Sequence, residues 1–141
     1  MMRKIILTAG SSLLLLLSGF SQATEMMLFP QYQKGGALSD GTRMATGRIL
    51  CRDSHSSFHV WMNAKKIEGR SAHYIIKGQR NSKNEMRVRL SGDGWSADAT
   101  EDRNGVVKIG KDESAIFDIL IDGDQNAAPD KYIFFLRGVC L

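Results

Sequence analysis

The sequence predicts an all-β domain. Apolar and polar residues alternate in short stretches, which is the period of a half-buried β-strand. Turn residues recur between these stretches at the short intervals found in sandwiches and barrels. Cys51 lies in an early stretch, Trp61 in the next, and Cys140 in the last. This order is similar to strands B, C and F of an immunoglobulin-like sandwich.

The chain begins with the pattern of a secretory signal peptide, residues 1–23. Two basic residues precede an apolar stretch, Ile5–Leu17, and small residues fit a cleavage site after Ala23. The apolar stretch is short for a membrane span, and no later stretch approaches the roughly 20 residues that a span needs. We therefore expect one exported domain, residues 24–141, with no membrane span.

Eight stretches are expected to be strands. In chain order they are residues 25–32, 43–52, 58–63, 73–77, 85–90, 106–109, 115–121 and 132–140. Pro30 in the first stretch cannot donate a backbone hydrogen bond, which favours an edge position or a break there. The segments 34–42 and 96–111 are polar and rich in turn residues. We therefore expect both to be loops, the second with at most one short strand.

Three of the central strands carry one apolar face each. Their inward positions are Ala45, Gly47, Ile49 and Cys51, then Met86, Val88 and Leu90, and finally Ala115, Phe117, Ile119 and Ile121. This alternation indicates strands that are covered on one side by the core and wetted on the other.

The last strand, 132–140, is apolar on both faces. Tyr132, Phe134, Leu136 and Cys140 share one face, while Ile133, Phe135 and Val139 share the other. Such a strand is typical of the interior of a sheet, yet the sequence contains no later stretch to flank it. Left open, it would expose unpaired backbone groups and favour aggregation. We therefore expect a sandwich that lacks strand G.

The two cysteines favour a disulfide, because oxidising compartments preserve such bonds in exported domains. A Cys51–Cys140 bond would close a loop of about 90 residues, worth about 4–5 kcal/mol by loop-closure entropy. Two free buried thiols are the alternative. A metal site built on both cysteines lacks further ligands nearby in the sequence.

The formal charge of +4 at pH 7 is unevenly distributed. Basic residues predominate from Arg43 to Arg89, and acidic residues predominate from Asp93 to Asp130. This asymmetry would steer a charged partner, although two solvated faces would give the same pattern. Nucleic acid is not an expected partner, because the chain has no basic run and is exported.

No pattern of catalytic residues stands out, and we expect no enzyme activity and no cofactor. His55 and His59 span a turn and a strand start, where a spacing of four aligns nothing, so ordinary surface or edge histidines are favoured. Acidic pairs such as Asp93 and Asp98 lack an apolar pocket that would raise one pKa for acid–base chemistry.

Asp122, Asp124 and Asn126 resemble the opening of a calcium-binding loop. The pattern then fails, because Ala127 stands at the glycine position and Ile133 at the position of the closing glutamate. A turn held by side-chain to backbone hydrogen bonds is the favoured interpretation. We therefore expect no metal site.

Four stretches carry a resemblance to a known family. They read LSDGTRMATGRILCRDSHSSFHVWMNAKKIEGR, EMRVRLSGDGWS, IDGDQNAAPDKYIF and GVCL. In this order around both cysteines they strongly resemble the Dr/Afa-type invasin family, the minor tip subunits of chaperone–usher fimbriae in Gram-negative enteric bacteria. Within that family the chain looks most like the minor pilin of an aggregative adherence fimbria. The resemblance covers roughly residues 38–141 and is loose around 100–114.

The resemblance implies an immunoglobulin-like sandwich without strand G, completed by a donor strand in trans. A periplasmic chaperone would lend the strand during export, and the major subunit would supply it in the fibre beyond the outer-membrane usher. The family's disulfide corresponds to Cys51 and Cys140. The donor-strand groove would be lined by Met27, Phe29, Tyr132, Phe134 and Leu136.

The resemblance also implies adhesion to epithelial cells or uptake by them, through integrin-type receptors, at the tip of a surface fimbria. The chain has no Arg-Gly-Asp, so the receptor contact cannot be placed on particular residues. A self-contained periplasmic or secreted binding or inhibitor module is the main alternative, in which the first strand would fill the gap beside the last. A small secreted hydrolase is the third hypothesis. Residues 24–33 could also donate to another subunit, although Pro30 disfavours it.

Overall fold

Fourteen strands and no helix make up the described part of the chain, residues 24–98, 100 and 103–141 of a computed structural model. The strands are β1 Glu25–Phe29, β2 Tyr32–Gln33, β3 Gly36–Leu38, β4 Arg43–Leu50, β5 Ser57–Met62, β6 Lys65–Lys66, β7 His73–Lys77, β8 Glu85–Ser91, β9 Trp95–Ala97, β10 Val106–Ile109, β11 Ser114–Ile121, β12 Gln125–Ala127, β13 Tyr132–Ile133 and β14 Leu136–Cys140.

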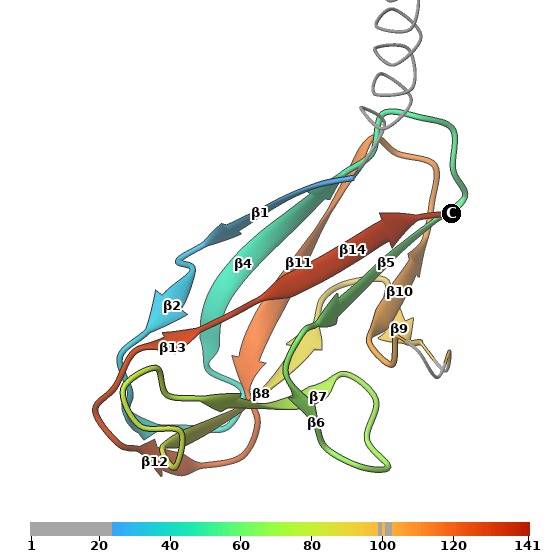
Figure 1. The fold of residues 1–141 in the computed structure, drawn as a ribbon. Helices are drawn as coiled ribbons and strands as arrows, with labels where there is room; N and C mark the ends of the chain where they lie inside the picture. The colour runs from blue at the N-terminus through green and yellow to red at the C-terminus, as the bar shows by residue number, and fades with distance from the viewer. Residues whose placement is uncertain (1–23, 99, 101–102) are drawn as a thin grey trace, which may run out of the picture.

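The strands form two main antiparallel sheets that pack as the layers of a sandwich (Figure 1). One sheet has the order β1-β4-β11-β8-β7-β6 and the other has the order β14-β5-β10-β9. Two short pairs, β12-β3 and β13-β2, complete the described fold. The expected all-β, immunoglobulin-like sandwich is confirmed, and the two sheets do not close into a barrel.

The core lies between the two sheets and uses the predicted inward faces. Met86, Val88, Phe117 and Ile119 are fully buried or nearly so, and so is Ile49 on β4. Along β4, Gly47 lies opposite Phe117 of β11, and the Phe117 ring occupies the space where a side chain at Gly47 would begin. Glycine at this position therefore allows the aromatic ring to fill the centre of the core.

Most of the expected strands are present, and three expectations are corrected. The single strand expected at 132–140 is divided into β13 and β14, because β13 pairs with β2 and β14 pairs with β5. The expected loop 34–42 contains β3, which pairs with β12. The expected long loop 96–111 overlaps β9, which is anchored by Trp95: its ring packs edge-on against Phe117, and its Nε1 donates to the Ile116 carbonyl at 2.8 Å.

The break expected at Pro30 is confirmed. Strand β1 ends at Phe29, and the chain then leaves the edge of the larger sheet and forms β2 against β13. The Phe29–Pro30 peptide bond is cis. Because β1 and β2 belong to different pairings, the first segment of the domain passes at this proline from the larger sheet to the short pair β13-β2.

A disulfide joins Cys51 and Cys140, as expected, and no free cysteine is present among the described residues. Cys51 follows β4 of the larger sheet and Cys140 ends β14 of the smaller sheet, so the bond ties the two layers together at one end. The expected signal peptide, residues 1–23, lies outside the described residues. Within the described part, no helix is long and apolar enough to cross a membrane.

Candidate strand-acceptor site

The smaller sheet ends at β14, and its hydrogen bonds to β5 reveal which backbone groups are used. Leu141 and Ser57 exchange both backbone hydrogen bonds, at 3.0 and 2.9 Å. Asn63 donates its N–H to the Phe135 carbonyl at 2.8 Å. In antiparallel strands such hydrogen-bonded pairs alternate with pairs whose backbone groups point away from each other.

The alternation assigns the two sides of β14. Arg137 and Val139 bond to β5, whereas Leu136, Gly138 and Cys140 direct their N–H and C=O groups to the opposite side. Among the described residues no strand pairs with that side. We call Leu136, Gly138 and Cys140 the acceptor edge. It offers three donors and three acceptors in the register of a further strand.

The acceptor edge begins where the chain's own first segment stops. Phe134 donates its N–H to the Gln31 carbonyl at 3.0 Å, on the same side of the strand as the acceptor edge. The residues before Gln31 do not continue along β14. They form β1, which pairs with β4 and ends just before Pro30. Strands β1 and β14 then run side by side without pairing (Figure 1).

Apolar side chains lie beneath this opening. Met26 and Leu28 of β1 are partly buried and pack against the core, as does Leu136 of β14. Gly138 has no side chain, and a Cβ there would lie 2.5 Å from Met26 Cε and 2.9 Å from Ile49 Cδ1. Met26 therefore reaches under β14 at the position where glycine leaves room.

The structure brings three of the five predicted groove residues together. Tyr132 and Phe134 are buried, and Leu136 is partly buried on the same face of the last segment. Met27 and Phe29 are placed differently: they are 51% and 84% exposed on the outer face of β1. The inner face of β1 carries Met26 and Leu28 instead. A groove beside β1 would therefore be lined by these two residues.

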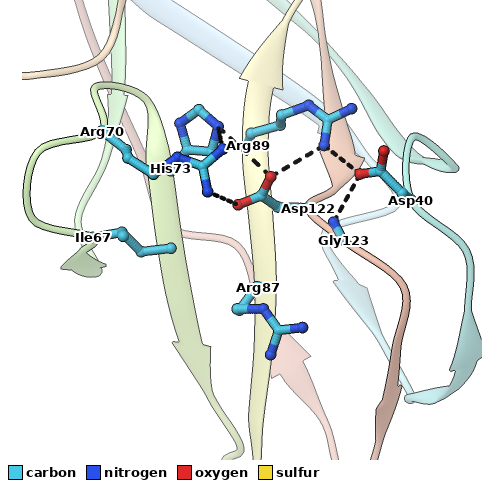
Figure 2. Close-up of a pocket in the computed structure, with 8 residues that line it drawn as sticks. All are labelled: Asp40, Ile67, Arg70, His73, Arg87, Arg89, Asp122 and Gly123. Atoms are coloured by element: carbon cyan, nitrogen blue, oxygen red, sulfur yellow. Dashed lines mark hydrogen bonds and ion pairs between the residues drawn. The ribbon is translucent and has the colours of Figure 1, made fainter.

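A polar pocket of about 590 Å³ lies elsewhere, over β7, β8 and the loop after β11 (Figure 2). Its centre is the nearly buried carboxylate of Asp122, 3.2 Å from Arg89 Nη1, 3.9 Å from Arg70 and 3.6 Å from His73 Nε2. Arg89 also bonds Asp40 at 2.7 Å. This hydrogen bond to Arg89 is the main reason that the pKa of Asp40 is lowered.

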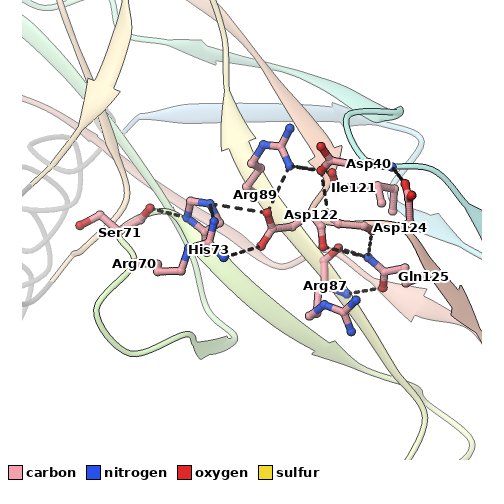
Figure 3. A network of polar contacts seen from close by, with 11 residues as sticks. Asp40, Arg70, Ser71, His73, Arg87, Arg89, Ile121, Asp122, Asp124 and Gln125 are labelled. Carbon is pink, nitrogen blue, oxygen red and sulfur yellow. Dashed lines mark hydrogen bonds and ion pairs between the residues drawn. The ribbon is translucent and has the colours of Figure 1, made fainter.

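The network continues on both sides of Asp122 (Figure 3). His73 Nδ1 lies 2.8 Å from the Ser71 carbonyl, so this nitrogen carries a proton and donates. Gln125 Nε2 donates to the carbonyls of Arg87, Asp122 and Gly123. Cations or N–H groups already contact the carboxylates of Asp40, Asp122 and Asp124. These contacts connect the strands to the neighbouring loops, and they do not leave an unpaired carboxylate at Asp122 for catalysis.

The residues of the calcium-like pattern serve this network. Asp122 pairs with arginines, and Asp124 Oδ1 accepts the Asp40 N–H at 2.7 Å. The turn held by side-chain to backbone bonds is therefore confirmed. Among the described residues, no group of three histidine, cysteine or acidic side chains is arranged to hold a metal ion.

A Ser-His-Asp arrangement lies on the outer face of β5. Ser57 Oγ is 2.9 Å from His59 Nε2, and His59 Nδ1 is 3.0 Å from Asp98 Oδ2. Burial alone would raise the pKa of Asp98, but hydrogen bonds from His59, Thr100 and Arg103 hold it well below the usual range. All three members of the arrangement are buried.

The prediction that His59 is a surface or edge histidine is wrong, because His59 is buried and its ring contacts Asp98. Ser57 and His59 do share a strand face by their spacing of two, but Asp98 is 39 residues away in the sequence. His55 is partly exposed, and its ring nitrogens contact the carbonyls of Asp53 and Asp112.

Comparisons with known proteins agree with this fold. The family model described as the Enterobacteria AfaD invasin protein matches residues 34–138. Protein AfaD of Escherichia coli is 41% identical over 139 residues, covering 99% of this chain and 94% of that protein.

Two solved structures are also similar. AggB, the minor subunit of aggregative adherence fimbriae type I from Escherichia coli, is 43% identical with a TM-score of 0.74, covering 83% of this chain and 84% of AggB. HdaB, the minor tip subunit of the E. coli Hda pilus, is 36% identical with a TM-score of 0.77, covering 84% of this chain and 82% of HdaB. The resemblance found in the sequence is therefore confirmed. The chain belongs to the Enterobacteria AfaD invasin family and is an exported minor subunit of a surface fimbria.

Proposed function

We propose that this chain acts at the fimbrial tip as a strand acceptor, completed along β14 by a strand from another protein. The observation that carries the proposal is the acceptor edge, where Leu136, Gly138 and Cys140 turn their backbone groups away from β5. A periplasmic chaperone would supply the strand first and the major subunit would replace it, with the outer-membrane usher as the site of exchange. Residues 1–23 would be removed on export.

The acceptor edge suits strand addition because it supplies both affinity and selectivity. Six backbone groups stabilise an added strand by about 0.5–1.5 kcal/mol per net hydrogen bond. Alternate side chains of that strand would pack on the apolar residues beneath the opening, Met26, Leu28 and Leu136. A donor with apolar residues at every second position is therefore expected to bind best.

A comparison of two forms of the domain tests the proposal. Residues 24–141 alone are expected to aggregate or to unfold without cooperativity, because the open edge is left exposed. The same residues followed by a short linker and an alternating apolar donor strand are expected to give a cooperative monomer. A donor of identical composition in scrambled order is the matched control. A stable monomer without any donor, unchanged when the donor is added, would refute the proposal.

We infer further that the exported subunit promotes adhesion to epithelial cells or uptake by them through an integrin-type receptor. Membership of an invasin family supports this inference. Binding of the donor-completed domain to epithelial cells, with and without integrin-blocking antibody, tests it. Undiminished binding in the presence of the antibody would exclude the integrin-type receptor.

A self-contained binding or inhibitor module is the second candidate, and β2 supports it. This strand pairs with β13, and Gln31 accepts the Phe134 N–H, so the chain covers part of its own edge. The cover stops at Phe134, however, and leaves the acceptor edge open. Amide exchange distinguishes the two functions: slow exchange at Leu136, Gly138 and Cys140 in the isolated chain would favour the self-contained module.

We propose that the chain is not an enzyme, despite the Ser57-His59-Asp98 arrangement. A nucleophile must reach its substrate, whereas Ser57 is buried and its Oγ also lies 3.5 Å from the Leu141 carbonyl. The described pockets are lined by other residues. A fluorophosphonate probe is expected to leave Ser57 unlabelled, and stoichiometric labelling that is lost in Ser57→Ala would establish a hydrolase instead.

A further inference from the structure

An exposed apolar surface lies where the acceptor edge ends. Phe29 is 84% exposed, Pro30 follows it, and Tyr32 is 44% exposed. We call these three residues the aromatic platform. Apolar side chains that cluster on the surface of an exported domain indicate contact with another molecule. The three residues of the platform are not part of the buried core.

Two hollows flank Tyr32, and their lining suggests the chemistry of the partner. One, of about 600 Å³, is lined by residues 28–35. The other, of about 560 Å³, is lined by Tyr32, Lys34, Gln79, Arg80, Pro129, Asp130 and Lys131. The Lys131 ammonium lies 4.6 Å from the centre of the Tyr32 ring.

The rim of the platform is positively charged. Lys34, Arg80 and Lys131 are exposed around the second hollow. The Asp130 carboxylate is nearly buried and accepts the backbone N–H groups of Arg80, Asn81 and Lys131, and the three cations outnumber its single negative charge. An apolar centre within a basic rim is complementary to a protein surface that combines apolar and acidic side chains.

The direction of an added strand places the donor beside this platform. Every paired strand in the described fold is antiparallel. An antiparallel donor would run from Cys140 towards Leu136. It cannot continue past Leu136 along the same edge, because Phe134 is already bonded to Gln31. The donor chain must therefore leave the sandwich beside Pro30.

We infer that the aromatic platform docks the folded domain of the subunit that donates the strand. A donor strand that precedes its own subunit's folded domain in the sequence brings that domain next to Phe29 and Tyr32, where the strand leaves the sandwich. The docked surface would present apolar residues to the platform and acidic residues to Lys34 and Lys131. This inference rests on the proposed strand-acceptor function and adds a second contact to it.

Two kinds of donor separate the platform from the strand site. One is the complete major subunit of the fimbria, and the other is a peptide containing its donor strand alone. Each donor is bound to the exported chain and to two double variants, Phe29→Ser/Tyr32→Ser and Lys34→Glu/Lys131→Glu. The rate of donor dissociation is then measured at the same urea concentration for every complex. Ile109→Ser on β10, which removes an apolar side chain that is 77% exposed, is the control.

Both platform variants are expected to accelerate dissociation of the complete subunit at least about tenfold, as loss of central interface residues does. Dissociation of the peptide is expected to change less than about twofold, which also shows that the variants fold. Equal acceleration for both donors, or none for the subunit, would overturn the inference. The inference would also be overturned if Leu141→Ser, and not the platform variants, accelerated dissociation of the complete subunit. The donor would then run parallel to β14 and leave the sandwich at the Leu141 end. Failure of the peptide to bind the unmodified chain would instead refute the strand-acceptor function.

Discussion

Removing the disulfide is expected to destabilise the completed domain strongly. Cys51 and Cys140 are separated by 89 positions. By loop-closure entropy, a cross-link over this distance disfavours the unfolded chain by about 4–5 kcal/mol. The free energy of unfolding of native proteins is only about 5–15 kcal/mol, so loss of the disulfide would remove a large part of it.

Urea unfolding of the donor-completed domain measures this effect. The double variant Cys51→Ala/Cys140→Ala is expected to lose about 4–5 kcal/mol in the free energy of unfolding, and each single variant about as much, because either one removes the bond. The dependence of this free energy on urea should also steepen, since the unlinked chain exposes more surface when unfolded. A loss below about 1 kcal/mol in the double variant would refute the reasoning.

Three further perturbations test the packing and the polar network, each by urea unfolding of the completed domain. Gly47→Ala is expected to cost about 1–3 kcal/mol, because its methyl group would meet the Phe117 ring; an unchanged midpoint would contradict the close approach. Arg89→Met is expected to lower the free energy of unfolding by about 1–3 kcal/mol, because Asp122 keeps only weaker partners. The loss is smaller than for a fully buried pair, because Arg89 is partly exposed. Arg43→Met, which removes an exposed ion pair, is the control. Burial alone would raise the pKa of Asp130, but hydrogen bonds from Arg80, Asn84, Lys131 and Asn81 hold it below the usual range. Its stabilising effect is therefore present above about pH 4 and lost as the pH falls further, and Asp130→Asn should reduce this acid sensitivity; an identical pH profile in the variant would exclude Asp130 as a source.

The strands were predictable from sequence wherever apolar and polar residues alternate cleanly. In β8 only one face is apolar, so the pattern identifies both the strand and its inward side. In β11 the inward face is wholly apolar, and Ser114 and Asp118 on the other face mark that face as the outer one. In β1 both faces are apolar, with Met26 and Leu28 on one and Met27 and Phe29 on the other. Local alternation cannot choose between such faces, so the sequence alone could not assign Met26 and Leu28 to the inner one.

The division of the last strand depended on a partner far away in the sequence. Tyr132 to Cys140 reads as one apolar stretch, and only the pairing of β13 with β2 separates its first residues from β14. The same holds for the polar sites. Asp122 meets His73 and Arg89, and Asp98 meets His59, across separations that no local pattern encodes.

The backbone pairing of β14 in the completed domain tests strand acceptance most directly. Scalar couplings across hydrogen bonds, measured between the isotope-labelled chain and a separately labelled donor peptide, identify which amides contact the donor. Couplings to the donor are expected from Leu136, Gly138 and Cys140, while Arg137 and Val139 remain bonded to β5. Couplings to the donor from Arg137 and Val139, or none from the acceptor edge, would contradict this expectation.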